Sequence, residues 1–370
     1  MQIIYHGISH LKEALKDSEK VFLVCGNSYR FLGIKEEIEK VDVSYVYFDG
    51  YTPNPLYDQV CKGIELFQKN QCDTIMAVGG GSAIDVAKCI KLAVLAKEGK
   101  LVLIPPMVNM RVVCEGSKLP FVAIPTTAGS GSESTHNAVM YYEGVKQTVT
   151  NDRVLPDYVV LEPTVLKSLP LYQKKCAMMD TLCQGIESWW SINSTEESKG
   201  YSKKCVELVV TNWHKYIFDD DEKAAKQIML AANYSGRAIN ITATTAAHAM
   251  SYKLTSLYKL PHGHAVAVCL PEVWEYMIEH IENCVDKRGK EYLENVFIGI
   301  AQAMGVQTPI EAITNFRCMM WQMELVNPIS EHLQLDIPLL ATSVNPIRLK
   351  NNPIKLDDKA IYSLYKMILK

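Results

Sequence analysis

The segment DTIMAVGGGSAIDVAKCIKLAVLA, residues 73–96, contains the pattern that decides the fold of the first part of this chain. An apolar run ends in three glycines, and a segment with helical spacing follows at once, which predicts a buried strand, a tight turn and a helix. Consecutive glycines let backbone N–H groups approach a phosphate, and the following helix directs its positive N-terminus at the same point. Tight strand-to-helix turns also need glycine, so this run alone is a weak signal.

The same alternation continues on both sides of this segment. VFLVCG (21–26) predicts a buried strand followed by a turn and a helix, and VDVSYVYFDG (41–50) predicts a second strand. FVAIPTTAGSGSE (121–133) predicts a strand that opens into a loop of small residues. Strands that alternate with helices are typical of a parallel, doubly wound, Rossmann-like sheet.

From about residue 166 the pattern changes to long segments with helical spacing, and strand-like runs become few. We therefore expect an α/β domain over residues 1–165 and an all-helical domain over residues 166–370. The boundary is expected in LEPTVLKSLP (161–170), where two prolines bracket a short polar turn.

The composition is that of an ordinary enzyme and narrows the range of partners. Of 370 residues, 48% are hydrophobic and 21% charged, and the net charge of −3 gives no reason to expect nucleic acid or a membrane surface as partner. No apolar run is long enough to span a membrane, and the first residues do not resemble a secretion signal. Eleven cysteines without CxxC spacing favour a reducing, cytoplasmic location with mostly buried thiols.

A second small-residue loop follows the strand at 121–125. Its hydroxyl groups, from Thr126, Thr127, Ser130 and Ser132, can bond a phosphate, a ribose or an amide. Such a loop can also be a simple surface turn. Two such loops at the carboxyl ends of neighbouring strands nevertheless favour a ligand site, because ligands of open α/β sheets bind there.

The segment TTAAHAMSYKLTSLYKLPHGH, residues 244–264, is the strongest candidate for the chemistry. It contains His248, His262 and His264, and imidazole is a good ligand for Zn²⁺ or Fe²⁺. Pro261 separates two predicted helices, so His248 and His262 can converge although fourteen residues separate them.

A predicted helix further upstream offers two more donors. Asp180 and Gln184 stand four residues apart in MMDTLCQGIESWW and therefore share one face of that helix. A carboxylate, an amide oxygen and two imidazoles make a plausible set of ligands for a divalent metal. A lone histidine would more often be a hydrogen-bonded core residue; the combined pattern favours metal.

At this point the chain resembles the iron-dependent (group III) alcohol dehydrogenase family. The likeness covers nearly the full length, in the expected order: PNP (53–55), GGGSAIDVAK (79–88), PTTAGSGSE (125–133), the Asp180 helix, His248 and PHGHAVAV (261–268). The resemblance implies a dehydroquinate synthase-like architecture, with a dinucleotide-binding domain over residues 1–165 and a metal- and substrate-binding domain over residues 166–370. It also implies NAD(H) or NADP(H) as cofactor and Fe²⁺ or Zn²⁺ as metal, with Asp180, Gln184, His248 and His262 as the metal ligands. The cofactor is expected to contact Gly26, Asn27, Ser28, Gly80, Gly81, Ser82, Asp85, Thr126, Thr127, Ser130 and Lys146.

Three positions depart from the family pattern. Gln184 and Tyr252 each replace a histidine, and an amide oxygen is a weaker ligand than imidazole. We expect metal to be retained, with Gln184 as a weak ligand or as a group that bonds the substrate. Gly26 stands where many NAD-using members have an acidic residue, so the sequence permits NADH, NADPH or both.

INSTEESK (192–199), AINITATTAAHAMSY (238–252) and PHGHAVAVCLP (261–271) resemble one branch of the family, the phosphonoacetaldehyde and sulfoacetaldehyde reductases. This implies reduction of a small anionic aldehyde, whose head group is expected at Arg237, Thr244, Thr245 and Lys253. Arg237 and Lys253 are equally well explained as solvated surface residues. The alkoxide proton is expected from Tyr252, His264 or a water relay, and the protein is expected to be a homodimer.

Other activities remain open within this pattern. A dehydrogenase of an uncharged primary alcohol or diol would use the same residues. A lyase or cyclase of the dehydroquinate synthase type would share the architecture but would need a more basic site, and a non-catalytic binding protein would not need the cofactor loops and the ligand set together.

Overall fold

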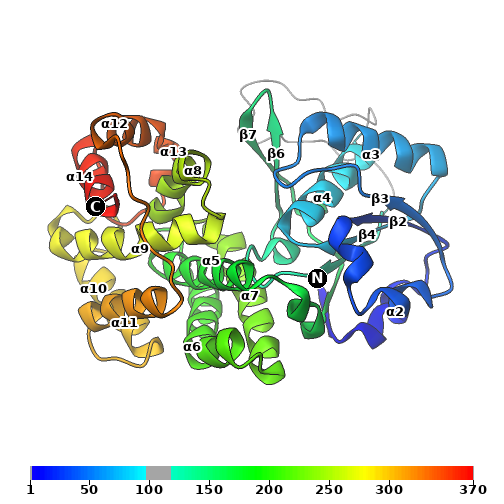
Figure 1. The fold of residues 1–370 in the computed structure, drawn as a ribbon, viewed down its shortest axis with the longest axis horizontal. Helices are drawn as coiled ribbons and strands as arrows, with labels where there is room; N and C mark the ends of the chain where they lie inside the picture. Colours follow the sequence, from blue (N-terminus) through cyan, green and yellow to red (C-terminus); the bar gives the residue numbers. More distant parts are fainter. Residues whose placement is uncertain (1, 97–117, 370) are drawn as a thin grey trace. The chain divides into compact units, whose positions relative to one another are not determined.

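The structure is a computed structural model that describes residues 2–96 and 118–369, and it divides into two compact units, Met1–Leu169 and Pro170–Lys370 (Figure 1). Unit 1 contains a six-stranded sheet in the order β1-β8-β5-β4-β2-β3, in which every pairing is parallel. The strands are β1 (Ile3–His6), β2 (Lys20–Cys25), β3 (Ser44–Phe48), β4 (Thr74–Gly79), β5 (Phe121–Pro125) and β8 (Tyr158–Leu161). The prediction of a parallel sheet is confirmed.

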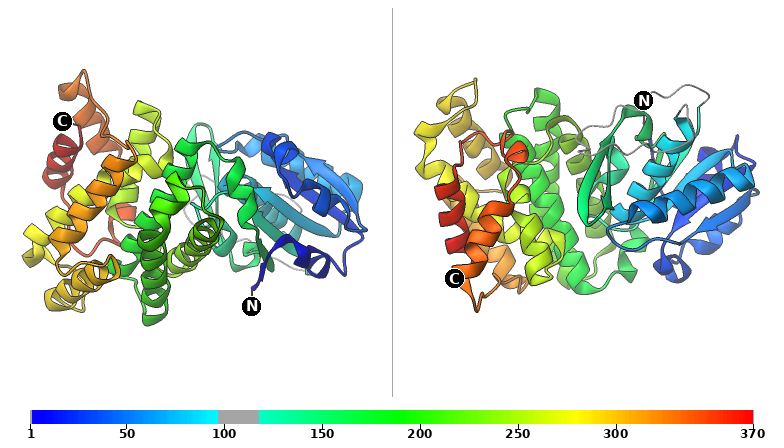
Figure 2. Two further views of the ribbon diagram at one scale, coloured as in Figure 1. Left: turned by 60° about the horizontal axis from the view of Figure 1, so that its bottom comes forward. Right: turned by 90° about the horizontal axis from the view of Figure 1, so that it is seen from above.

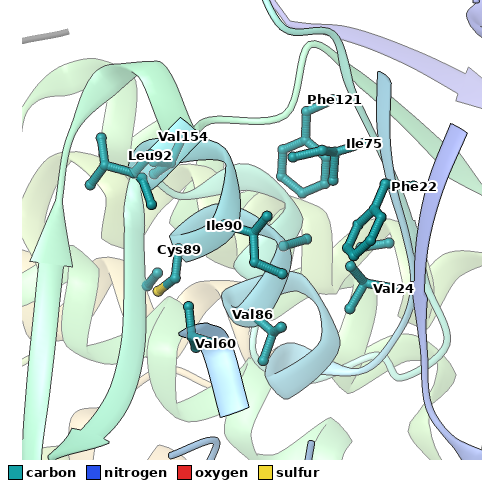
Figure 3. Packing of buried hydrophobic residues seen from close by; sticks show 14 of the residues in the cluster. Phe22, Val24, Val60, Ile75, Val86, Cys89, Ile90, Leu92, Phe121 and Val154 are labelled. Carbon is teal, nitrogen blue, oxygen red and sulfur yellow. The ribbon is translucent and has the colours of Figure 1, made fainter. Parts of the chain in front are cut away.

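The core of unit 1 lies between this sheet and two helices. Unit 1 has α1 (Leu11–Ala14), α2 (Lys35–Glu39), α3 (Tyr57–Asn70) and α4 (Gly81–Leu95). Figure 3 shows strand residues close to helix residues in this core, among them Phe22, Val24, Ile75, Phe121, Val60, Val86, Cys89 and Ile90. Because α4 is apolar around most of its surface, it is buried along nearly its whole length.

An antiparallel hairpin in unit 1 was not predicted. It pairs β6 (Asn137–Tyr142) with β7 (Val145–Thr150), and Glu143 and Gly144 form its turn with positive φ angles of 49° and 76°. Ala138 and Met140 are buried while their neighbours are only partly buried, which is the alternation of a half-buried strand. This alternation around a glycine turn is the signal that could have revealed it.

A buried lysine ties this hairpin and the small-residue loop to α4. The Lys88 ammonium donates to Ser132 O at 2.6 Å, Asn137 O at 2.7 Å, and the hydroxyls of Ser132 and Thr135 at 3.0 Å each. The Ser132 hydroxyl in turn donates to Asp85 Oδ1 at 2.6 Å. Burial lowers the pKa of Lys88 to about 8, although the charge of Asp85 acts in the opposite direction.

Unit 2 is built from helices, as predicted, and Figure 2 shows it from two further directions. The helices are α5 (Leu171–Trp190), α6 (Glu196–Phe218), α7 (Glu222–Thr242), α8 (Ala246–Tyr258), α9 (His262–Glu279), α10 (Lys290–Ala303), α11 (Pro309–Gln322), α12 (Leu333–Ser343), α13 (Pro346–Leu349) and α14 (Asp358–Ile368). Helix α5 packs against α6, α7 and α9 and is almost completely buried after its first turn. Polar side chains on α5 must therefore find partners inside the unit.

Within residues 2–96 and 118–369, no helix combines the length and the apolar character needed to cross a membrane. The ten cysteines of these residues are free thiols, and most of them are buried. The expectation of a cytoplasmic homodimer stays a prediction.

We predict that Lys88→Met destabilises the protein by about 3–5 kcal/mol, because the substitution leaves the Ser132 and Asn137 carbonyl groups without their cationic donor and removes the positive charge near the buried Asp85 carboxylate. Urea unfolding measures the difference. The matched control is Lys35→Met, which removes an exposed lysine 2.6 Å from Glu39 and should cost at most about 0.5 kcal/mol. Equal stability of the two variants would show that the Lys88 network does not hold unit 1 together.

Candidate active site

The glycine turn and the hydroxyl loop lie side by side at the carboxyl edge of the sheet. Gly79 pairs with Pro125 in the register of β4 and β5, and the Thr126 N–H donates to Gly79 O at 3.0 Å. A Cβ atom added at Gly80 would lie 3.2 Å from Thr127 Cγ2, and one added at Gly81 would lie 2.8 Å from Ser130 Oγ. The two loops are thus packed together as closely as the absence of side chains on these glycines allows.

The N-terminus of α4 is built from small residues, Gly80, Gly81 and Ser82. Gly80 is the N-cap of α4, and the structure gives this terminus no side-chain cap. Unsatisfied N–H groups at a helix N-terminus attract an anion, so this turn fits a dinucleotide pyrophosphate. Ser82, in the first turn, accepts from the Asn54 N–H at 3.4 Å.

The other cofactor candidates divide into two groups. Gly26, Asn27 and Ser28 follow β2, the neighbour of β4, and the last two are exposed. Asp85 instead accepts from Ser132 Oγ and the Val139 N–H, so it helps to hold the loop in place. Burial raises the pKa of Asp85, while the charges of Lys88 and of Lys146 on β7 act to lower it.

In unit 2 the structure brings together three of the predicted metal ligands. Asp180 Oδ1 lies 3.3 Å from His248 Nε2 and 4.0 Å from His262 Nε2, and one ligand atom of each residue lies within 4.8 Å of the other two. Donors that share one ion at about 2.0–2.2 Å are at most about 4.4 Å apart, so small side-chain movements suffice to bind it. One carboxylate and two imidazoles are a donor set that suits Zn²⁺ or Fe²⁺.

Gly263 determines how closely α9 approaches α5. A Cβ atom at this position would lie 2.0 Å from Cys176 O and 2.9 Å from Asp180 Cβ. The first of these is a backbone atom that cannot move away cheaply. Only glycine permits this contact, and the contact places His262 beside Asp180.

Sequence reasoning missed Glu187, which lies directly behind His248. Its side chain is fully buried and accepts from the Thr245 hydroxyl at 2.7 Å and from the Thr245 and His248 N–H groups at 3.1 and 3.3 Å. The other carboxylate oxygen bonds His248 Nδ1. This bond directs Nε2 at Asp180, as carboxylates behind metal-binding histidines commonly do. The spacing of Asp180, Gln184 and Glu187 on one helix face was the available signal.

The two carboxylates also make this position attractive to a cation. Although burial acts to lower it, the charges of Glu187 and Asp180 raise the pKa of His248 to about 10. A metal ion bound to Nε2 takes the place of the proton that the carboxylates stabilise there.

Gln184 is buried next to this cluster, on the same face of α5 as Asp180. Its Oε1 accepts from the Ser235 hydroxyl at 2.8 Å. An amide oxygen has two lone pairs, so this bond is compatible with a second interaction of the same oxygen. The role of Gln184 as a metal ligand stays a prediction.

The two candidate proton donors have different surroundings. The Tyr252 ring stacks on His262 at 5.7 Å between centroids and 5° between planes, and its hydroxyl accepts from Arg348 Nη1 at 3.0 Å. His264 instead bonds Tyr172 Oη through Nδ1, at 2.9 Å, and Val326 O through Nε2, at 2.8 Å. His264 stands two residues after His262 on α9 and therefore points to another side of that helix. Tyr252 instead stacks on His262, so the structure brings Tyr252, and not His264, to the metal cluster.

The structure places the predicted substrate residues on α7, on α8 and in the segment between these helices. Arg237 lies 5.5 Å from the Tyr201 ring centroid, in the packing of α7 on α6. Thr245 is fully buried and bonded to Glu187, and the carbonyl of the partly buried Thr244 accepts from Asn351. Lys253 is partly buried on α8. The role of these four residues in substrate binding stays a prediction.

Comparison with known proteins matches both units. A family model described as iron-containing alcohol dehydrogenase matches residues 3–163, and the model of the C-terminal part of that family matches residues 175–369. Phosphonoacetaldehyde reductase of Streptomyces viridochromogenes is 32% identical over 89% of this chain and 83% of its own length. An alcohol dehydrogenase of Thermococcus barophilus is 27% identical over 97% of this chain and 95% of its own length.

Solved structures share the fold. The structure of sulfoacetaldehyde reductase from Bifidobacterium kashiwanohense in complex with NAD⁺ matches with a TM-score of 0.87 and 23% identity, over 99% of this chain and 96% of that one. At this identity the likeness concerns the fold alone.

We predict that Gly80→Val weakens NAD(P)H binding at least about tenfold, because a branched side chain then stands beside Thr127 at the helix N-terminus where we expect the pyrophosphate. Titration of the cofactor fluorescence measures the dissociation constant. Gly33→Val is the control, since an added Cβ there meets no atom within 4 Å. A folded Gly80→Val protein with wild-type affinity for the cofactor would contradict the assignment of this turn to the pyrophosphate.

We also predict that Glu187→Gln lowers metal affinity about 10- to 100-fold. The glutamine amide can donate to His248 Nδ1, but the ring proton then lies on Nε2, the atom that has to bind the metal. In the opposite orientation its N–H groups point at the donors of Thr245. Competition with a chelator measures the affinity, and circular dichroism checks the fold. Unchanged affinity in a folded variant would mean that Glu187 does not orient His248.

Proposed function

This chain belongs to the iron-containing alcohol dehydrogenase family, and we propose that it reduces a small aldehyde bearing a phosphonate or sulfonate group. The family makes it an NAD(P)-dependent alcohol dehydrogenase or aldehyde reductase with a divalent metal. The observation that carries the proposal is the cluster of Asp180, His248 and His262 with Glu187 behind it. The relative that reduces phosphonoacetaldehyde, at 32% identity, supports the anionic substrate.

The proposed reaction converts the aldehyde, NAD(P)H and a proton into the alcohol and NAD(P)⁺. A divalent ion, when bound, would act as a Lewis acid on the carbonyl oxygen. NAD(P)H supplies the hydride that forms the new C–H bond. The remaining tasks fall to side chains and backbone of this chain.

Three of these tasks can be assigned to particular groups. We propose that Asp180, His248 and His262 hold the ion, with Gln184 as a fourth, weaker ligand. The backbone of Gly80 and Gly81 at the N-terminus of α4 would hold the pyrophosphate, and Thr126, Thr127 and Ser130 would lie along the nicotinamide half. The rigid stack of Tyr252 on His262 would keep its hydroxyl at a fixed position beside the carbonyl group.

Tyr252 is the proton donor in this proposal. A phenol both donates and accepts, and the bond from Arg348 uses an acceptor lone pair of the hydroxyl. The hydroxyl can thus give its proton to the product oxygen. His264 is less suited because both of its ring nitrogens have partners and burial lowers its pKa.

We predict net oxidation of NADH or NADPH when the full-length protein with Fe²⁺ or Zn²⁺ is given phosphonoacetaldehyde or sulfoacetaldehyde. For one of them kcat/KM should exceed that for propanal at least about tenfold, since a hydrogen bond to a charged group is worth about 1.5–3 kcal/mol. Absorbance at the reduced-nicotinamide band gives the rates, and NMR identifies the alcohol. Preference for propanal would instead assign a dehydrogenase of uncharged alcohols, and no net oxidation with any aldehyde would favour a lyase or cyclase.

A further inference from the structure

An arginine that sequence reasoning did not consider contacts Tyr252, the residue that stacks on His262. Arg348 is on the short helix α13, and the chain reaches it 96 residues after Tyr252. Its Nη1 donates to Tyr252 Oη at 3.0 Å, and its Cζ lies 5.0 Å from the centroid of the Tyr252 ring. Tyr252 in turn stacks on His262, one of the proposed metal ligands. Tyr252 therefore contacts both Arg348 and His262.

Arg348 brings a positive charge to this position. It donates to a phenol, and a guanidinium keeps its charge when it makes such a bond. Its side chain is partly buried, so an anion beside it would be less screened than on an open surface.

The position suits the substrate class in size and in charge. In a two-carbon aldehyde only the CH₂ group separates the carbonyl carbon from the phosphorus or sulfur atom. A substrate whose carbonyl lies at the metal cluster therefore places its anionic oxygens within a few bonds, beside the Tyr252 ring. The guanidinium fork matches tetrahedral oxyanions with two parallel hydrogen bonds, which an ammonium group does not offer.

We propose that Arg348 is the specificity-determining residue that binds the phosphonate or sulfonate group of the substrate. Tyr252 shares in this role, because its hydroxyl fixes one nitrogen of the guanidinium and its ring fixes the distance to His262. The inference rests on the proposed function and adds to it the residue that recognises the anionic group of the substrate. It also moves this role from Arg237 and Lys253, where the sequence placed it, to a residue from another helix.

The test compares Arg348→Met, which removes the charge but keeps a long apolar side chain, with Arg348→Lys and the control Arg237→Met. Arg237 is matched because it also lies over a tyrosine ring. The readouts are kcat/KM for phosphonoacetaldehyde, sulfoacetaldehyde and propanal, the metal content, and the dissociation constant of 2-hydroxyethylphosphonate from the metal-loaded protein by calorimetry.

We expect Arg348→Met to lower the ratio of kcat/KM between the preferred anionic aldehyde and propanal about 10- to 100-fold, mainly through KM. Arg348→Lys should lose part of this ratio and Arg237→Met none, with wild-type metal content in all three. The dissociation constant of 2-hydroxyethylphosphonate should rise in parallel with the loss in ratio. If Arg348→Met slows all aldehydes equally, or keeps the wild-type ratio, the inference is overturned.

The same data separate a failure of the inference from a failure of the proposed function. A wild-type protein that reduces no aldehyde contradicts the proposed function, and calorimetry then decides on Arg348 alone. Weaker binding of 2-hydroxyethylphosphonate by Arg348→Met still supports an anion site at Arg348, and equal binding by both proteins refutes it. A wild-type protein that prefers propanal and does not bind the phosphonate contradicts both.

Discussion

The bond between Glu187 and His248 Nδ1 is the constraint on which the arrangement of the site depends. A fully buried carboxylate is costly unless several donors satisfy it, and Thr245 and His248 supply these donors from the first turn of α8. The same bonds fix α8 against α5 and turn His248 Nε2 toward Asp180. Stability and ligand geometry thus come from one set of contacts, and Gly263 adds the close approach of α9 that completes the cluster.

A comparable device organises the other unit. The buried ammonium of Lys88 joins α4, the loop that contains Ser132 and the hairpin that begins at Asn137. This loop also contains Thr127 and Ser130, which lie against Gly80 and Gly81. A single buried charge therefore holds the hydroxyl loop in register with the N-terminus of α4, where backbone donors alone offer an anion site. Each unit uses a buried ionic group to position a binding surface made of small or polar residues.

The sequence predicted those features that depend on local spacing. The glycine turn between a buried strand and a helix, the helical second half, and the pairing of Asp180 with His248 follow from the spacing of apolar residues, from turn chemistry and from the family motifs. Contacts between distant segments were not predictable in this way: Arg348 reaches Tyr252 from α13, and Ser235 reaches Gln184 from α7. Arg237, which the sequence grouped with His248, lies over the Tyr201 ring, a contact that nearness along the chain does not predict.

The most direct test of the account is a crystal structure of the full-length protein grown with Fe²⁺, with anomalous data measured on both sides of the iron absorption edge. The account predicts one anomalous peak per chain, bonded to Asp180, His248 Nε2 and His262 Nε2 at about 2.0–2.2 Å, with Glu187 still bonded to His248 Nδ1. An iron peak at other residues, or His248 turned away from the ion, would contradict the central claim that Glu187 prepares this cluster for metal.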